Sequence, residues 1–263
     1  MSAHMKSPVE IRLYSARPTL DARPLKKRVG LIILSTDHTT EPDFQRMVAG
    51  PDIGVYVARI PFANPVTPDN LRAMQPSLIE AAALILPGEE LDAICYSCTA
   101  ASVVIGDAEI EAAIQAAKPG VPVVTPPLAG VRGLRALGAK RISVLTPYTV
   151  ETSRPMASYF ANHGFDIASF TCLGLRDDRE MARISPTALV ELARDAMSDD
   201  ADALFISCTA VRAALAAIDI EKATGRPLVS SNLASAWSCL RLCGDEAARP
   251  EFGRLMTMPM ARG

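Results

Sequence analysis

The 263-residue sequence lacks several features that would point to common classes of protein. Aromatic residues make up only 5%, and the formal net charge is −2, so nothing in the composition favours nucleic-acid binding. No apolar run approaches the roughly 18 residues that a membrane-spanning helix needs. The first residues contain no apolar segment of the kind that a signal peptide carries. We therefore expect a cytoplasmic protein with neither a membrane nor a nucleic-acid partner.

Metal-ligating patterns are also scarce. The three histidines, His4, His38 and His163, show no ligand spacing. Cys95 and Cys98 form a Cys-x-x-Cys pair, but the sequence has no second pair, and a structural zinc site needs four ligands. Six cysteines in a chain of this length do not make a disulfide framework, and they suit a reducing compartment. We predict no metal site.

Two similar runs, residues 91–100 and 201–210, both end in Ser-Cys-Thr-Ala. Each contains a short apolar stretch typical of a buried parallel strand. A helical pattern follows each run, over 101–117 and 211–223. Each Ser-Cys-Thr therefore lies where a strand ends and a helix begins, which is where open α/β sheets bind their ligands.

Cys98 and Cys208 occupy the same place in these two runs. The free N–H groups at the start of a helix stabilise an anion. We therefore expect a lowered pKa for these thiols and a role as nucleophile or base. The alternative is a pair of buried core thiols, the usual fate of a free cysteine. Two cysteines at matched positions of repeated units favour chemistry.

The rest of the chain follows one strand-loop-helix plan twice. Besides the two runs, strands are predicted over residues 29–34, 53–60, 121–124, 141–145, 165–172 and 228–230. Further helices are predicted over 70–86 and 186–197, and four more should end near residues 48, 137, 162 and 243. This internal duplication predicts an α/β fold of two similar parallel-sheet lobes related by a pseudo-twofold axis. A single cleft between the lobes would bring both cysteines to one ligand.

The predicted boundaries divide the chain into an arm and two lobes. Residues 1–27, with Pro8 and two further prolines, form an N-terminal arm that we expect to pack on a partner subunit. Residues 28–124 plus 232–263 form the first lobe, and residues 125–231 form the second. The arm favours a homo-oligomer, either a dimer or a tetramer.

Several motifs together resemble the aspartate/glutamate/hydantoin racemase superfamily. They are the two Ser-Cys-Thr motifs, the loop Ser35-Thr36-Asp37 with Glu41-Pro42, and residues 137–141 leading to Thr146-Pro147-Tyr148. The branch resembles maleate cis-trans isomerases and arylmalonate decarboxylases. Within it, residues 36–41 and 177–181 are most similar to the ectoine-utilisation protein A family.

This resemblance implies cofactor-independent chemistry beside the carboxylate of a small acid, with one thiolate and one thiol facing each other across it. Cys98 would be the nucleophile or first base and Cys208 the acid. Hydroxyls and N–H groups at helix starts would hold the carboxylate and the charge that develops on it. The candidates for substrate binding are Ser35, Thr36, Ser97, Thr99, Tyr148, Ser207, Thr209 and Asn232, with Thr125 and Ser231 at equivalent strand ends. For Tyr148, the alternative is a ring stacked on its own loop.

Asp37 is a departure from the maleate isomerases, which have an asparagine there. A carboxylate in the site would repel a dicarboxylate and favour an ammonium or a neutral donor. The alternative is that Asp37 caps the following helix or pairs with a nearby cation. The charged segment 176–183 is either a solvated face or a lid over the cleft.

The sequence therefore predicts a two-cysteine isomerase or racemase of a small amino- or acylamino-acid, in ectoine or hydroxyectoine catabolism. One alternative is a maleate cis-trans isomerase, which would convert maleate to fumarate. Another is a ligand-binding or accessory subunit that kept the fold. The two cysteines argue against the last alternative, because a binding protein needs neither thiol.

Overall fold

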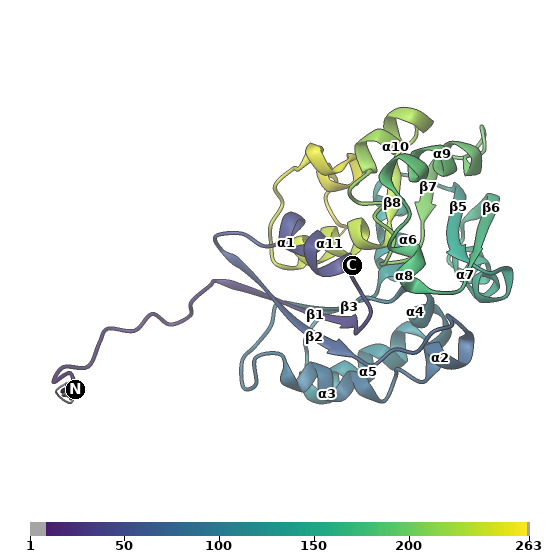
Figure 1. Cartoon of the computed structure of the whole chain (residues 1–263). Helices are drawn as coiled ribbons and strands as arrows, with labels where there is room; N and C mark the ends of the chain where they lie inside the picture. The colour runs from purple at the N-terminus through teal and green to yellow at the C-terminus, as the bar shows by residue number, and fades with distance from the viewer. Residues whose placement is uncertain (1–8, 262–263) are drawn as a thin grey trace, which may run out of the picture.

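The computed structural model describes residues 9–261 and contains two four-stranded parallel sheets (Figure 1). The first sheet holds β1 (Lys27–Leu34), β2 (Ile53–Ile60), β3 (Ala93–Tyr96) and β4 (Val123–Val124), in the order β2-β1-β3-β4. The second holds β5 (Arg141–Tyr148), β6 (Asp166–Leu175), β7 (Ala203–Ile206) and β8 (Leu228–Ser230), in the order β6-β5-β7-β8. The identical order confirms the predicted two-lobed α/β fold.

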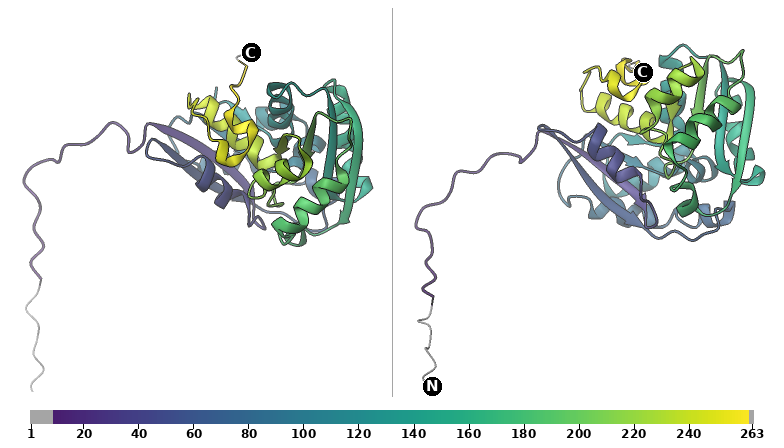
Figure 2. Two further views of the ribbon diagram at one scale, coloured as in Figure 1. Left: turned by 90° about the horizontal axis from the view of Figure 1, so that it is seen from above. Right: turned by 45° about the horizontal axis from the view of Figure 1, so that its top comes forward.

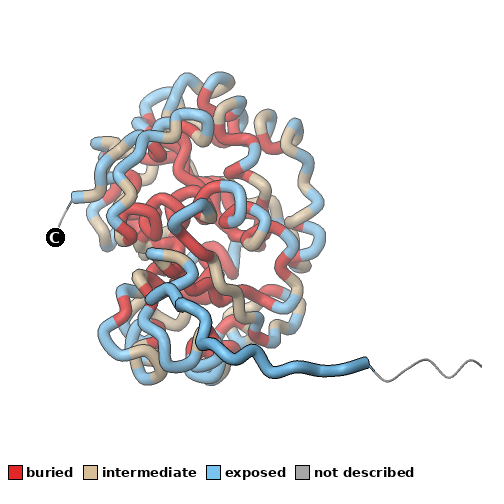
Figure 3. Tube along the Cα trace, turned by 90° about the vertical axis from the view of Figure 1, so that its left-hand side faces the viewer, coloured by how far each residue is buried: buried red, intermediate tan, exposed pale blue. Residues whose placement is uncertain are grey.

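The central strands are apolar because helices cover both faces of each sheet. Residues 29–34 of β1 and all of β3 and β7 are buried. Figure 3 shows that the buried residues gather in the interior of the molecule. β4 is shorter than predicted, since Pro122 has no N–H to donate to the ladder. In the first lobe, α3 (Ser77–Leu84) packs on β1 and β2, and α1 (Thr40–Met47) contacts the same two strands. In the second, α7 (Val150–Asn162) and α9 (Pro186–Ala196) pack on β5 and β6.

Three predicted helices differ from the observed ones. The helix over 101–117 is divided by Gly106, whose φ of +108° ends α4 (Thr99–Ile105) before α5 (Asp107–Ala117). The helix over 70–86 is divided into α2 (Pro68–Arg72) and α3 at Pro76, which disfavours helical backbone before it.

The third difference follows the second cysteine motif, where α10 (Ala217–Thr224) begins later than predicted. Residues 211–216 form turns with hydrogen bonds three residues apart, from the Val211 N–H to the Cys208 carbonyl and from the Ala216 N–H to the Ala213 carbonyl. The helices predicted to end near 48, 137, 162, 197 and 243 end within a residue of these positions.

Two matched helices join the lobes. α6 (Pro126–Ala136) follows β4 of the first sheet but packs on β8 of the second, and α11 (Ser231–Leu242) follows β8 but packs on β3 and β4 of the first. The two helices also pack on each other. Trp237 of α11 is fully buried and donates its indole N–H to the Met258 carbonyl at 2.8 Å. The predicted lobe boundaries fall at the starts of these two helices.

The described part of the N-terminal arm runs away from both lobes (Figure 2). Residues 9–24 are all exposed, including the large apolar side chains of Ile11 and Leu13. Pro8 and His4 lie outside the described residues. Within residues 9–261, no helix has both the length and the apolar character needed to cross a bilayer.

Candidate active site

Cys98 and Cys208 line one cavity between the two lobes. The lining residues come from the last residues of three strands of each sheet or from the segments that follow these strands: Leu34, Asp37, Phe62, Val66, Leu71, Cys98 and Ala100 from the first lobe, and Tyr148, Asp178, Met181, Cys208, Thr209 and Ala210 from the second. The carboxyl ends of both sheets thus meet at this cavity, as the position of the Ser-Cys-Thr motifs predicts.

The backbone fixes both thiols in the cavity wall. Cys98 is the N-cap of α4, and the Ala101 N–H points at its sulfur. Cys208 has a φ of +86°, a left-handed conformation that non-glycine residues rarely adopt. Its Sγ lies 3.9 Å from the Met181 Sδ, and the N–H groups of Ala210 and Val211 point at it. A strained backbone that presents a reactive side chain is typical of functional sites.

Burial raises the pKa of both thiols, which contradicts the lowered values expected from the sequence. The pKa of Cys98 is raised to about 12 and that of Cys208 to about 11, because removal from water disfavours the thiolate. The N–H donors at each sulfur act in the opposite direction but are outweighed. Both cysteines are therefore thiols at neutral pH while the cavity is closed.

Tyr148 lies at the end of β5, and its side chain faces both sulfurs. A hydrogen bond from its hydroxyl lowers the pKa of Cys208 and so opposes the effect of burial. Burial raises the pKa of the phenol itself well above its usual value, so it remains a donor.

Asp37 lines the cavity and also caps α1. Its carboxylate accepts hydrogen bonds from the Thr39 N–H at 2.8 Å, the Thr40 N–H at 2.7 Å and the Thr40 hydroxyl at 2.6 Å. The capping alternative is thus observed, although Asp37 is the capping side chain and Thr39 at the N-cap position makes no such bond. Burial raises the pKa of Asp37 despite these donors.

A second carboxylate, that of Asp178, faces the cavity from α8 (Asp178–Met181). It is 5% exposed and accepts hydrogen bonds from the Thr36 hydroxyl and, at 2.8 Å, from the Asn64 side-chain amide. Its own backbone N–H donates to the Asn64 Oδ1 at 3.2 Å. The sequence reasoning missed Asp178 as a site residue, although it follows a strand within the charged segment considered as a lid.

The roof of the cavity consists of α8 and the loop after β2. These two segments are tied together by the Asn64 contacts and by the Val66 N–H, which donates to the Arg176 carbonyl at 2.8 Å. Phe62, Val66 and Met181 point apolar side chains into the cavity. The charged segment therefore covers the cleft, which is the lid interpretation.

The cavity measures about 20 Å³, which is room for about one water molecule and not for a four-carbon acid. A molecule of that size could therefore enter only if the roof moved. In such a dry site, hydrogen bonds and charges act more strongly than in water.

Of the predicted binding residues, Asp37, Tyr148 and Thr209 line the cavity, and the others do not. Ser35 is exposed. The remaining hydroxyls are buried or half-buried and serve their neighbours: Thr36 donates to Asp178, Ser97 to Thr40 at 3.4 Å, Thr99 to Ser231 at 2.7 Å, and Thr125 to Asp107, while Ser207 is fully buried. The hydroxyls of Thr36, Ser97, Thr99 and Thr125 are therefore bonded to neighbouring side chains and do not line the cavity.

Asn232 also lies behind the cavity wall. Its amide donates to the Asp43 carboxylate and to the Thr209 carbonyl, both at 2.9 Å. It therefore joins α11 to α1 and to the turn that carries Cys208. Burial raises the pKa of Asp43 to about 6, although Asn232 and Arg46 both stabilise its charge.

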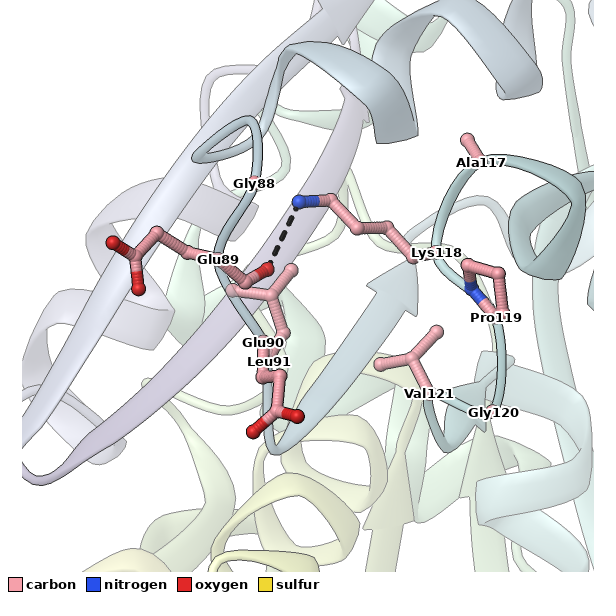
Figure 4. A pocket seen from close by; sticks show the side chains of 9 residues that line it. All are labelled: Gly88, Glu89, Glu90, Leu91, Ala117, Lys118, Pro119, Gly120 and Val121. Carbon is pink, nitrogen blue, oxygen red and sulfur yellow. Dashed lines mark hydrogen bonds between the residues drawn. The ribbon is translucent and has the colours of Figure 1, made fainter.

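A larger hollow of about 390 Å³ lies at the opposite edge of the first sheet, where the chain enters β3 and β4 (Figure 4). Lys118 spans it and donates to the carbonyls of Leu86 at 2.7 Å and Glu89 at 3.1 Å. It contains neither a thiol nor a strand's carboxyl end, so the smaller cavity is the candidate site. Residues 9–261 contain no group of three or more His, Cys, Asp or Glu side chains placed to hold a metal ion.

Comparisons with known proteins relate the chain to two kinds of enzyme. A family model described as arylmalonate decarboxylase matches residues 66–256. A maleate isomerase from Nocardia farcinica is 29% identical over 246 residues, covering 89% of this chain and 97% of that protein. An arylmalonate decarboxylase from Bordetella bronchiseptica is 34% identical over 139 residues, covering 52% of this chain and 58% of that protein.

A solved structure has a similar fold. It is a cysteine-to-serine mutant of the Nocardia farcinica maleate cis-trans isomerase with a covalently bound succinylcysteine intermediate. It is 25% identical, covers 88% of this chain and 98% of its own, and superimposes with a TM-score of 0.80.

Proposed function

Because the chain belongs to the arylmalonate decarboxylase family, we propose that it is a two-cysteine enzyme that moves a proton next to the carboxylate of a small amino- or acylamino-acid. The main support for this proposal is that Cys98, Cys208 and Tyr148 all line one closed cavity. A core thiol needs no such cavity and no second thiol across it.

The proposed reaction uses the two sulfurs in opposite protonation states. Cys98 first loses its proton to water while the roof is open, before burial raises the pKa of its thiol. The resulting thiolate takes the proton from the carbon next to the carboxylate, and that carbon's electron pair moves into the carboxylate as an enediolate. The Cys208 thiol then returns a proton to the opposite face, which leaves Cys208 as thiolate and inverts the carbon. The Tyr148 hydroxyl is a donor beside both sulfurs and can stabilise the thiolate form of Cys208.

The charge of the cavity wall supports an amino-acid substrate. Asp37 lines the cavity, and no lysine, arginine or histidine is among the lining residues. A second negative group on the substrate would lie beside this carboxylate without a compensating cation. The assignment to ectoine or hydroxyectoine catabolism rests on the resemblance of residues 36–41 and 177–181 alone.

A maleate cis-trans isomerase is the second candidate, favoured by the relative from Nocardia farcinica that aligns over 97% of its length. In that reaction the Cys98 sulfur adds to the double bond, the new single bond rotates, and elimination of the thiolate gives fumarate. The third candidate, an accessory binding subunit, accounts for neither thiol in the cavity.

Proton exchange in heavy water tests these functions directly. The purified protein is incubated with maleate, aspartate, 2,4-diaminobutyrate and its acetyl derivatives, and the substrate protons are followed by NMR. We expect loss of an α-proton signal that both Cys98→Ser and Cys208→Ser abolish. Cys172→Ser, which changes a half-buried thiol in β6, serves as the control.

Rapid conversion of maleate without exchange of any amino acid would favour the second candidate. Ligand binding without exchange or isomerisation of any compound would favour the accessory subunit.

A further inference from the structure

The acidic side chains around the site differ in whether a cation pairs with them. Asp43 pairs with Arg46 at 2.8 Å, and Glu41 pairs with Arg59 at 2.8 Å. The two carboxylates that line the cavity, those of Asp37 and Asp178, form no salt bridge within residues 9–261.

The nearest cations are turned away from the cavity. Arg59 donates to the Asp37 backbone carbonyl at 3.0 Å and directs its other nitrogen to Glu41. Arg179, next to Asp178 in the chain, is exposed and binds the Asp177 carboxylate. Neither guanidinium forms a salt bridge with Asp178, because Arg59 pairs with Glu41 and Arg179 with Asp177.

Asp178 is the more unusual of the two carboxylates. Its hydrogen-bond partners, Thr36 and Asn64, are both neutral, and its side chain is almost completely removed from solvent. A buried carboxylate is normally compensated by a cation, because hydrogen bonds from neutral groups replace only part of its lost hydration. The structure thus places a buried carboxyl group without a salt-bridge partner at the wall of the cavity.

We propose that Asp178 and Asp37 together form the subsite that binds the ammonium group of the substrate, with Asp178 as the residue that determines specificity. This inference rests on the proposed function and assigns the substrate class: a small carboxylic acid that also carries a free amine. An ammonium has three donors and no acceptor, so two carboxylates are suitable partners. A dicarboxylate finds two negative charges and no cation.

The position of Asp178 also connects recognition with closure. Asp178 lies on α8 in the roof, whereas Asp37 lies on the body of the first lobe just after β1. A cation between them attracts the roof to the body, as the Thr36 hydrogen bond does in the closed cavity. Substrates without the ammonium lose this attraction and leave the thiols exposed to water.

The test compares Asp178→Asn with Glu180→Gln, which removes a carboxylate from the exposed face of the same helix. The two probes are 2,4-diaminobutyrate and maleate, each used to protect Cys98 from alkylation by iodoacetamide at pH 8. We expect the wild type and Glu180→Gln to be protected by 2,4-diaminobutyrate at concentrations at least tenfold lower than by maleate. In Asp178→Asn, this preference should shrink at least tenfold or reverse.

Equal protection of Cys98 in the wild type by both probes would overturn the inference. This result needs no variant, so the test still decides if Asp178→Asn folds poorly. An unchanged preference in folded Asp178→Asn would also overturn it. Protection is measured apart from turnover. Selective protection without proton exchange would therefore refute the proposed function and leave the ammonium subsite standing.

Discussion

Asp43 provides a test of how burial and charge act on stability next to the site. It is 3% exposed, accepts a hydrogen bond from Asn232, and pairs with Arg46. Its pKa is nevertheless raised from 3.8 to about 6, because the loss of hydration outweighs these partners. We predict that Asp43 stabilises the folded protein at low pH and loses this effect as the pH rises. An ordinary salt-bridged carboxylate has the opposite pH dependence, and Asp43→Asn should remove the contribution of Asp43.

The sign follows from proton binding. Between pH 4 and pH 6 the unfolded chain has an ionised Asp43, whereas the folded protein holds its proton. The folded state therefore binds more protons, and stability falls as the pH rises through this window. A shift from 3.8 to about 6 corresponds to about 3 kcal/mol, all of it lost by pH 7.

The measurement is urea unfolding of the wild type and Asp43→Asn at pH 4 and at pH 7.5. Other titrating groups act on both proteins, so the difference between them isolates Asp43. Asparagine keeps an oxygen that can accept from Asn232 but loses the ion pair with Arg46. We expect the wild type to lose about 2.5 kcal/mol relative to the variant over this range, because part of the ~3 kcal/mol is already lost at pH 4. A difference that is independent of pH, or that grows in favour of the wild type, would refute the reasoning.

Three further predictions concern the backbone, the roof and the packing between lobes. Cys208→Gly should stay within about 1 kcal/mol of wild-type stability because glycine accepts a positive φ, while Cys208→Val should lose about 2 kcal/mol or more in thermal unfolding. Thr36→Val removes the hydroxyl that holds Asp178 and should speed alkylation of Cys98 several-fold, as followed by mass spectrometry. Gly130→Ala should cost about 1–3 kcal/mol in urea unfolding, since its Cβ would come within 2.7 Å of the buried Phe205 ring.

Matched controls make these outcomes specific. Ser35→Ala, an exposed neighbour of Thr36, should leave the alkylation rate unchanged. Gly50→Ala, where an added Cβ meets no atom within 4 Å, should be neutral or slightly stabilising. Equal losses of stability in Gly50→Ala and Gly130→Ala would contradict the packing argument. Equal rates of Cys98 alkylation in the wild type, Ser35→Ala and Thr36→Val would contradict the roof argument.

The sequence predicted the sheets well because each strand is a short apolar run and the plan occurs twice. It located Cys98 and Cys208 for the same reason, since a motif repeated at matched strand ends identifies both walls of a cleft. Helix boundaries were less predictable where a single residue ends the helix. Gly106 and Pro76 interrupt patterns that periodicity alone reads as continuous.

The identity of the other cavity residues depended on tertiary structure. Ser97, Thr99 and Ser207 follow strands, as site residues do, but their hydroxyls lie behind the wall. Phe62 and Asp178 reach the cavity from loops whose path no local pattern specifies. The raised thiol pKa values likewise come from burial, whereas helix position alone predicts the opposite direction.

The exchange of α6 and α11 between the two sheets has a consequence for the origin of the site. A chain of half this length, with one sheet, would leave the apolar face of its last helix uncovered. Two such chains could bury these faces if each packed its last helix on the sheet of the other. A symmetric pair of this kind presents the same cysteine twice across its axis. Cys98 and Cys208 reproduce such a symmetric pair within one chain, but in different local surroundings, because Cys98 is the N-cap of α4 whereas Cys208 has a positive φ.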